Sequence, residues 1–399
     1  MRSIFLVLAL LLIPSATKAQ TTRDILTAFR QGTPVVNLRL RGEHVTRDGI
    51  DDPARALTLR SAFGYRSGSY QGLTAFIEAE AVTALPDDDG YANAGAGALN
   101  NRVTDRPVIA DPVATEVNQA YLRYAAEKAT VTLGRQEIIF SDSRLVGNVG
   151  WRQNHQSFDA ARIDISPDDG LSMSYALVRE AHRITGQDAA MQSHLAEARV
   201  RIADFGSAIA YATLLDYDDA VGLSRSTFGG RFEGSRALGD DFLGRIEVGY
   251  ALQSDAFDNP EDITTDYMLF GGRVGRGSSA LHLRWERLGG SEADGAFVTP
   301  LATLHKFNGW ADAFLATPPR GLVDLEVGFA TELRGARMAL ILHDFSSDEG
   351  GLHYGRELDF SAAYATAAGL KLGAKVAHYV ADEGGADTTK LWIWTVIGL

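Results

Sequence analysis

The 399-residue chain contains no cysteine. This absence excludes a disulfide scaffold, thiolate catalysis and the usual structural zinc sites. After its first twenty residues the chain also lacks any apolar run near the roughly 20 residues that a membrane-spanning helix needs. An excess of basic charge is missing too, because 38 Lys and Arg stand against 51 Asp and Glu, a net charge of −13. A chain this acidic is a poor partner for nucleic acid.

The first nineteen residues have the order typical of a secretory signal peptide. Arg2 is followed by the apolar run 4–13 and then by a small-x-small site that ends at Ala19. We therefore predict residues 1–19 as a signal peptide, cleaved after Ala19. Cleavage removes two basic residues and no acidic one, which takes the net charge from −13 to about −15.

Residues 20–34 are predicted to form a periplasmic N-terminal segment. Within it, Ile25, Leu26 and Phe29 stand at helical spacing. A short periplasmic helix or tether is the favoured interpretation, and a plug for the domain that follows is the alternative.

From residue 35 onward the apolar periodicity is two almost everywhere. In VNLRLRGEH (residues 36–44), Val36, Leu38 and Leu40 fall on one face and polar side chains on the other. FLGRIEVGYAL (residues 242–252) and ALHLRWERL (residues 280–288) repeat the pattern. Such alternation predicts strands with two unlike faces.

Eighteen segments of this kind are predicted. They lie near residues 35–44, 56–66, 70–82, 115–126, 129–137, 158–165, 171–181, 194–203, 206–217, 225–236, 241–253, 264–276, 279–288, 322–332, 336–346, 354–366, 369–380 and 389–399. The links after even-numbered segments are short, whereas those after odd-numbered segments are mostly long and include 83–114, 138–157 and 289–321. This sorting is typical of an outer-membrane barrel with periplasmic turns and extracellular loops.

The expected fold class is therefore all-β, a transmembrane antiparallel β-barrel of about 18 strands over residues 35–399. We expect it in the bacterial outer membrane, surrounded by the lipid bilayer and inserted by the barrel-assembly machinery. A barrel this wide encloses water rather than a packed core.

The polar parity of the strands carries many charges, which line the lumen if the apolar parity faces lipid. Arginine suits an anion pore because its fixed fork of donors binds carboxylates bidentately. Arginines that pair with Glu on neighbouring strands would merely brace the wall, and this alternative stays open for each residue. The candidate pore residues are Arg39, Arg41, Arg123, Arg162, Arg199, Arg201, Arg231 and Arg245, with Glu197, Glu233 and Glu247 expected to fix arginine rotamers.

Two positions are hard to place on the lumen. Arg135 follows Val131 and Leu133 at the apolar parity, so only a bulge at Gly134 or a position at the aqueous rim accommodates it. Asp159, a further candidate, has the opposite parity to Arg162, so both cannot line the lumen without an irregularity.

Signatures of enzymes and metal sites are absent or poor. No P-loop, HExxH or G-x-S-x-G occurs, and GGRVGRG (residues 271–277) lacks the dinucleotide spacing. The nine histidines are scattered, none at metal-ligand spacing. Asp87, Asp88 and Asp89 could bind Ca²⁺, although a solvated acidic loop explains them better. We therefore expect no cofactor and no metal.

The stretch LGRQEIIFSDSRLVGNVGWRQNHQSFDAARI (residues 133–163) resembles the alginate-export family of bacterial outer-membrane proteins. The matching features are a strand ending L-G-R-Q, a loop with D-x-R and a Trp, and a strand beginning F-D-x-x-R. A second patch, LHKFNGWADAF (residues 304–314), resembles the family's H-K-F-x-G segment with a following Asp, here Asp312. The C-terminal Leu399 departs from the aromatic residue that usually ends such barrels.

The resemblance implies an eighteen-stranded barrel with an arginine-rich constriction that passes an anionic polyuronate, gated by loops or a periplasmic segment. It adds Arg135 and Arg144 to the candidate pore residues. Residues 138–157 then form an extracellular loop whose arginines and Asp142 fold at or into the pore mouth.

The sequence thus predicts an outer-membrane channel that passes an anionic small molecule or polysaccharide, such as a uronate polymer or oligomer. A general diffusion porin without polymer specificity is the alternative within transport. An outer-membrane enzyme such as a lipase or deacylase would need a Ser/His pair that the sequence does not supply, and a structural barrel with a blocked lumen is a third alternative. The oligomeric state stays open.

Overall fold

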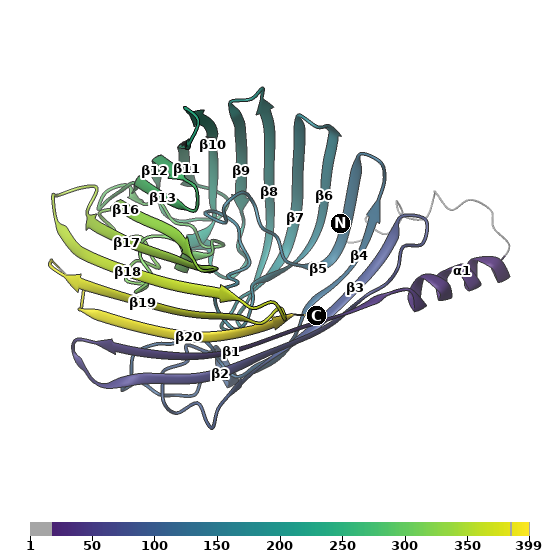
Figure 1. The fold of residues 1–399 in the computed structure, drawn as a ribbon, viewed down its shortest axis with the longest axis horizontal. Helices are drawn as coiled ribbons and strands as arrows, with labels where there is room; N and C mark the ends of the chain where they lie inside the picture. The colour runs from purple at the N-terminus through teal and green to yellow at the C-terminus, as the bar shows by residue number, and fades with distance from the viewer. Residues whose placement is uncertain (1–17, 384, 399) are drawn as a thin grey trace.

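Eighteen long strands form one antiparallel sheet that closes on itself into a barrel (Figure 1). This computed structural model describes residues 18–383 and 385–398, so the signal-peptide prediction for residues 1–19 falls almost entirely outside the described residues. Each strand pairs with its neighbours in sequence, and β1 pairs with the last strand, β20, to close the sheet. No helix in the described part of the chain is both long and apolar enough to cross a bilayer.

The strand bounds agree with all eighteen predicted segments. The barrel strands are β1 (Thr33–Arg47), β2 (Ile50–Arg66), β3 (Leu73–Ala84), β4 (Ala114–Ala125), β5 (Ala129–Gln136), β6 (Ser157–Asp168), β7 (Leu171–His182), β8 (Asp188–Ile202), β9 (Gly206–Leu215), β10 (Arg225–Leu238), β11 (Phe242–Asp255), β12 (Thr264–Arg276), β13 (Ser279–Leu288), β16 (Leu322–Leu333), β17 (Ala336–Ser346), β18 (His353–Ala365), β19 (Lys371–Ala381) and β20 (Thr388–Gly398). A small hairpin, β14 (Gly290–Ser291) and β15 (Gly295–Ala296), lies outside the barrel sheet. The predicted fold class is confirmed.

The two faces of the strands differ as the alternation predicted. Large apolar side chains such as Phe63, Ile246 and Leu283 are more than half exposed, at the parity that faces lipid. On the other parity of the same wall, Arg60 and Glu80 are buried and form an ion pair. The last strand follows the rule, because Leu391 and Ile393 are exposed while Trp392 is buried inside.

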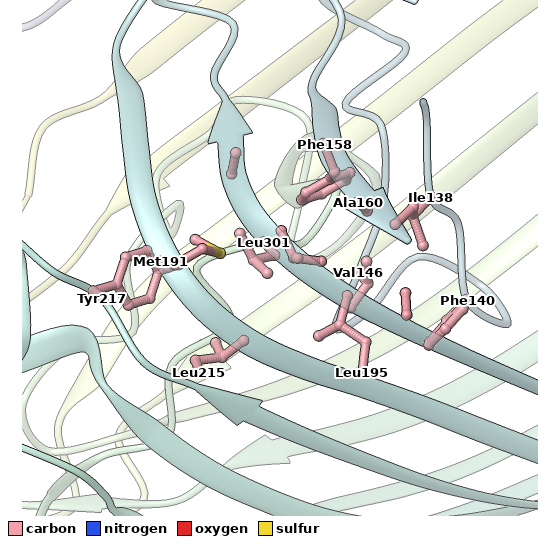
Figure 2. Close-up of a cluster of buried hydrophobic side chains, with 13 residues drawn as sticks. Ile138, Phe140, Val146, Phe158, Ala160, Met191, Leu195, Leu215, Tyr217 and Leu301 are labelled. Atoms are coloured by element: carbon pink, nitrogen blue, oxygen red, sulfur yellow. The ribbon is translucent and has the colours of Figure 1, made fainter. Parts of the chain in front are cut away.

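Three long connections fold into the barrel instead of projecting from it. They are residues 85–113, 137–156 and 289–321, each of which follows an odd-numbered strand in barrel order. Not every link on this side is long, since the link between β1 and β2 contains only residues 48 and 49 and the link between β7 and β8 only residues 183–187. Figure 2 shows Ile138, Phe140, Val146 and Leu301 from the second and third connections packed with wall residues. Part of the lumen is therefore filled by a local hydrophobic core rather than by water.

The segment before the barrel forms helix α1 (Lys18–Arg30), as the helical spacing predicted. It lies outside the barrel, beyond the end at which β1 begins (Figure 1). Ile25, Leu26 and Phe29 are exposed, and the Phe29 ring contacts the Tyr65 ring in a tilted arrangement with ring centroids 5.2 Å apart. The alternative of a plug is therefore wrong, because the helix does not enter the lumen.

Candidate channel lumen

Connections 137–156 and 289–321 meet inside the barrel and form one unit. Val146 and Leu301 make a parallel β-bridge, and the Gly147 amide donates to the Leu301 carbonyl at 2.9 Å. The Gln156 side-chain amide donates to the carbonyls of both Gly147 and Leu301 at 2.8 and 3.1 Å. We call these two connections the inward loops. Because they share hydrogen bonds, one cannot move far without the other.

Two arginines of the first inward loop pin it to the barrel wall. The Arg144 guanidinium binds Glu286 on β13 at 3.1 Å and also donates to the Asn308 side chain at 3.0 Å. Arg152 binds Glu43 on β1 at 3.3 Å and Asp312 of the second loop at 2.8 Å. These five charged side chains are almost fully buried. Removing one partner would leave a buried charge unpaired, so both contacts fix the loop position strongly.

Arginines of the wall hold the loop backbone from the other side. On β1, Arg39 donates to the Gly150 carbonyl at 2.8 Å and to the Gln153 side chain at 2.7 Å. Arg41 donates to the Trp151 carbonyl and pairs with Asp111 of connection 85–113. These two guanidinium groups therefore stabilise the loops.

A cluster of aromatic rings surrounds one lysine where the two inward loops meet the wall. Trp151 comes from the first loop, Trp310 from the second, Trp392 from β20 and Lys375 from β19. The Lys375 ammonium lies 3.7 Å from the Trp310 ring centre and 4.3 Å from that of Trp151. It also approaches Nε2 of His305 at 2.9 Å, and that imidazole stacks on Trp151. Cation–π contacts in a desolvated site contribute about 2 kcal/mol each. This cluster fixes the loop against β19 and β20.

His305 and Asp312 form a tightly coupled buried pair in the same loop. Their facing atoms, Nδ1 and Oδ1, lie 2.6 Å apart, and Lys390 binds the other carboxylate oxygen at 2.6 Å. Burial alone would raise the pKa of the Asp312 carboxyl, but His305, Lys390 and Arg152 hold it well below its usual range. Burial lowers the pKa of His305 well below its ordinary value. The positive charge of Lys375 lowers this pKa further, whereas the negative charge of Asp312 raises it. His305 is therefore a neutral imidazole that donates to Asp312 and accepts from Lys375.

Arg231 on β10 joins the first inward loop to a pair of wall carboxylates. It binds Asp142 of the loop, Glu233 on its own strand and Glu247 on β11. Burial would raise the pKa of Asp142, yet the charge and hydrogen bond of Arg231 lower it below the ordinary value. Glu247 also faces Arg284 at 3.5 Å. The prediction that Glu233 and Glu247 fix arginine rotamers agrees with these contacts.

Arg245 on β11 and Arg273 on β12 are different, because they stand directly opposite each other in register. No carboxylate among the described residues lies within ion-pair distance of either, and both side chains are exposed. Like charges directly opposite in a sheet repel each other. Both line a cavity of about 420 Å³ with Arg231, Arg284 and His282, and Glu233, Glu247 and Glu326 line it too. This cavity is the most cationic open part of the lumen wall that we find.

The structure divides the predicted pore residues into several groups. Arg39, Arg41, Arg144 and Arg231 hold the inward loops, whereas Arg199 pairs with Glu233 at 3.1 Å and Arg162 pairs with Asp164 at 2.7 Å. Arg123, Arg201 and Arg245 are exposed at the lumen parity, with no ion pair to other described residues. Glu197 accepts a hydrogen bond from Ser141 of the loop, so its expected role with an arginine is wrong.

Arg135 and Asp159 do not line the pore. They face each other across β5 and β6 at 2.9 Å, on the parity of the exposed Leu133. Arg135 also donates to the Val117 carbonyl at 3.1 Å. The strand register is regular there, so alternation places both side chains outside, near the ends of the strands that carry the long connections.

Three residues that matter were missing from the predicted set: Arg152, Arg273 and Arg284. Arg273 shares a face with Leu269 and Gly271, so extending the alternation through the glycine-rich stretch would have found it. Arg152 lies in a loop, where no periodicity applies, and only the tertiary contacts show its role.

Comparisons with solved structures show the fold of an outer-membrane porin. The OccK9 (OpdG) structure from Pseudomonas aeruginosa has a TM-score of 0.73 and 12% identity, covering 93% of this chain and 100% of that one. OpdK from Pseudomonas aeruginosa, solved with vanillate, has a TM-score of 0.72 and 12% identity over 92% and 98%. OccAB4 from Acinetobacter baumannii has a TM-score of 0.71 and 14% identity over 92% and 99%. No curated protein sequence matches significantly.

The closed barrel, its apolar outer belt and its polar lumen are those of an outer-membrane β-barrel with the porin fold. Residues 46–236 match the alginate-export family, which confirms the resemblance seen in the sequence.

Proposed function

We propose that this channel passes anionic solutes, and that acidic saccharides, namely uronate polymers or oligomers such as alginate, are its substrate class. The observation that carries the proposal is the opposed pair Arg245 and Arg273. Most other lumen arginines are bound to carboxylates or loop carbonyls. Arg123 and Arg201 are also without an ion pair among the described residues, but Arg245 and Arg273 stand together and present two guanidinium forks to water. Such forks bind carboxylates bidentately.

A second cavity supports a saccharide rather than a simple ion. It measures about 330 Å³ and is lined by Trp151, Trp310, Lys306, Lys375 and Glu326, the last of which also lines the arginine cavity. Aromatic faces beside cations suit a ring that carries a carboxylate. Each cavity has the size of a small-molecule site, which favours uronate oligomers with the loops in this position.

A general diffusion porin is the second candidate, and one observation favours it. Glu233, Glu247 and Glu326 line the same cavity as the arginines, so the wall carries both signs. The vanillate in the OpdK structure is a small carboxylate, which suggests that small anions deserve testing beside oligouronates.

Charge reversal at the arginine pair separates the two candidates. The double variant Arg245→Glu and Arg273→Glu is expected to lose anion preference in reversal-potential measurements across a planar bilayer. Arg135→Gln is the matched control, since Arg135 lies on the outer face and its loss leaves lumen charge unchanged. If the double variant keeps wild-type selectivity, the anion-channel proposal fails.

A further inference from the structure

A row of acid, imidazole and acid crosses three strands of the lumen wall. Glu326 on β16 stands directly opposite His343 on β17, and His343 stands directly opposite Glu357 on β18. Asp324 and Asp359 flank the row on the same face. Ligand atoms of Asp324, Glu326 and His343 all lie within 4.8 Å of one another. These residues are far apart in sequence, which explains why histidine spacing did not reveal them.

Two buried carboxylates at the end of this row are only half satisfied. Oε1 of Glu357 accepts the Ala311 amide at 2.7 Å and Oδ2 of Asp359 accepts the Trp310 amide at 3.2 Å. Their other oxygens, Oε2 of Glu357 and Oδ1 of Asp359, are buried without any hydrogen-bond partner. Within residues 18–383 and 385–398, no lysine or arginine forms an ion pair with either group. The His343 imidazole, with Nε2 3.7 Å from Asp359, is the only ion-pair partner of the two groups among the described residues, so a positive ligand would stabilise two adjacent buried carboxylates that have little countercharge.

The neighbouring groups point to the kind of ligand. His343 Nδ1 lies 2.9 Å from Asp324 and its Nε2 lies 3.7 Å from Asp359, so the imidazole stands between the two carboxylates. Carboxylate oxygens together with one imidazole nitrogen suit transition-metal ions better than Ca²⁺ or Mg²⁺, which prefer oxygen alone. The 330 Å³ cavity lined by His343 and Glu326 gives an ion access from the lumen.

We propose that this row binds one divalent transition-metal ion of the Zn²⁺ or Mn²⁺ type, held by Nε2 of His343 and by the carboxylates of Glu357 and Asp359, while Asp324 orients the imidazole through Nδ1. The carboxylates that would hold the ion also accept the amides of Trp310 and Ala311. The ion therefore fastens the second inward loop to the wall over the pore.

Metal binding to the purified full-length barrel in detergent tests the proposal. Zn²⁺ and Mn²⁺ are titrated by calorimetry, with Ca²⁺ for comparison. The wild-type protein is expected to bind one ion, and His343→Asn and Glu357→Gln are expected to lower the affinity about tenfold or more. Circular dichroism of each variant checks that the barrel has folded.

A second group of the same residue types provides the control. Asp159, Glu180 and His182 also have ligand atoms within 4.8 Å of one another, but Arg135 already neutralises Asp159. His182→Asn is therefore expected to leave binding unchanged. Loss of binding in His182→Asn but not in His343→Asn would overturn the proposal.

Crystals of the wild-type protein soaked in Zn²⁺ need no variant, since anomalous scattering locates the ion directly. An anomalous peak between His343 and Glu357 supports the site. Absence of any peak there, together with no calorimetric binding at millimolar metal, would show that a shared proton neutralises Glu357 and Asp359 instead, and would overturn the proposal.

Discussion

At the scale of single residues, the lumen arginines divide into two kinds. Those with carboxylate or carbonyl partners, such as Arg152 and Arg41, fix the inward loops, whereas Arg245 and Arg273 are left for solutes. The sequence could show which arginines share the polar parity. It could not show which of them would find partners, because the partners of an arginine such as Arg39 lie in a loop more than a hundred residues away.

Arg152→Met is expected to destabilise the barrel by about 3–5 kcal/mol, because it leaves the buried carboxylates of Glu43 and Asp312 with less countercharge. Urea unfolding in detergent, followed by circular dichroism, measures the change. Arg276→Met is the matched control, since the Arg276–Asp241 pair is well exposed and such pairs contribute about 0–1 kcal/mol. Equal losses in the two variants would contradict the role given to Arg152.

Alanine substitutions at two glycines, one in the second inward loop and one in a turn, test the contact between that loop and the wall. Gly309 and Gly369 both have φ of +84°, but a Cβ on Gly309 would lie 2.4 Å from the Glu357 carboxylate, whereas one on Gly369 would meet nothing within 4 Å. Both alanine variants therefore share a backbone cost of about 1–2 kcal/mol. We expect Gly309→Ala to cost about 1–3 kcal/mol more. The difference in unfolding free energy is the measurement, and no difference would mean that the loop does not press on β18.

At the scale of elements, the strands could be predicted and the loops could not. Apolar and polar residues alternate because one side of the wall faces lipid and the other faces the lumen. Each strand meets both environments, so each strand shows the alternation. Arg135 shows its strength, because its parity argued against the lumen while the family resemblance favoured it, and the structure places it on the outer face. Loop positions depend instead on contacts such as the Val146–Leu301 bridge, for which the sequence has no periodic signal.

The inward loops should respond to acid through His305. Burial holds the pKa of His305 well below 6.5, so the folded protein resists a proton that the unfolded chain accepts. The stabilisation is complete above pH 6.5 and is lost as the pH falls below it, by up to about 1.4 kcal/mol per pH unit. Urea unfolding from pH 8 to 5.5 measures this loss.

His305→Gln is the matched variant for this pH dependence. Its amide can still donate to Asp312 and accept from Lys375, but it does not titrate. The slope of stability below pH 6.5 should be shallower in the variant than in the wild type. An unchanged slope would place the titrating group elsewhere.

At the scale of the whole molecule, the chain is acidic, yet one cavity of its lumen wall is lined by four arginines against three glutamates. The net charge of −13 is a sum over the whole chain, whereas Arg245, Arg273 and Arg284 line one cavity. Net charge therefore says little about the solute that a channel prefers, since the local field in the lumen decides that preference. The eighteen-stranded wall is wide enough to hold both the inward loops and this cavity.

The reversal potential of the wild-type channel in a salt gradient, with and without oligouronates, tests the central proposal most directly. We predict a potential of the sign for anion preference and a reversible drop in conductance when oligouronates are added, with vanillate less effective. A weakly selective conductance that oligouronates do not change would contradict the acidic-saccharide proposal and leave a general diffusion porin.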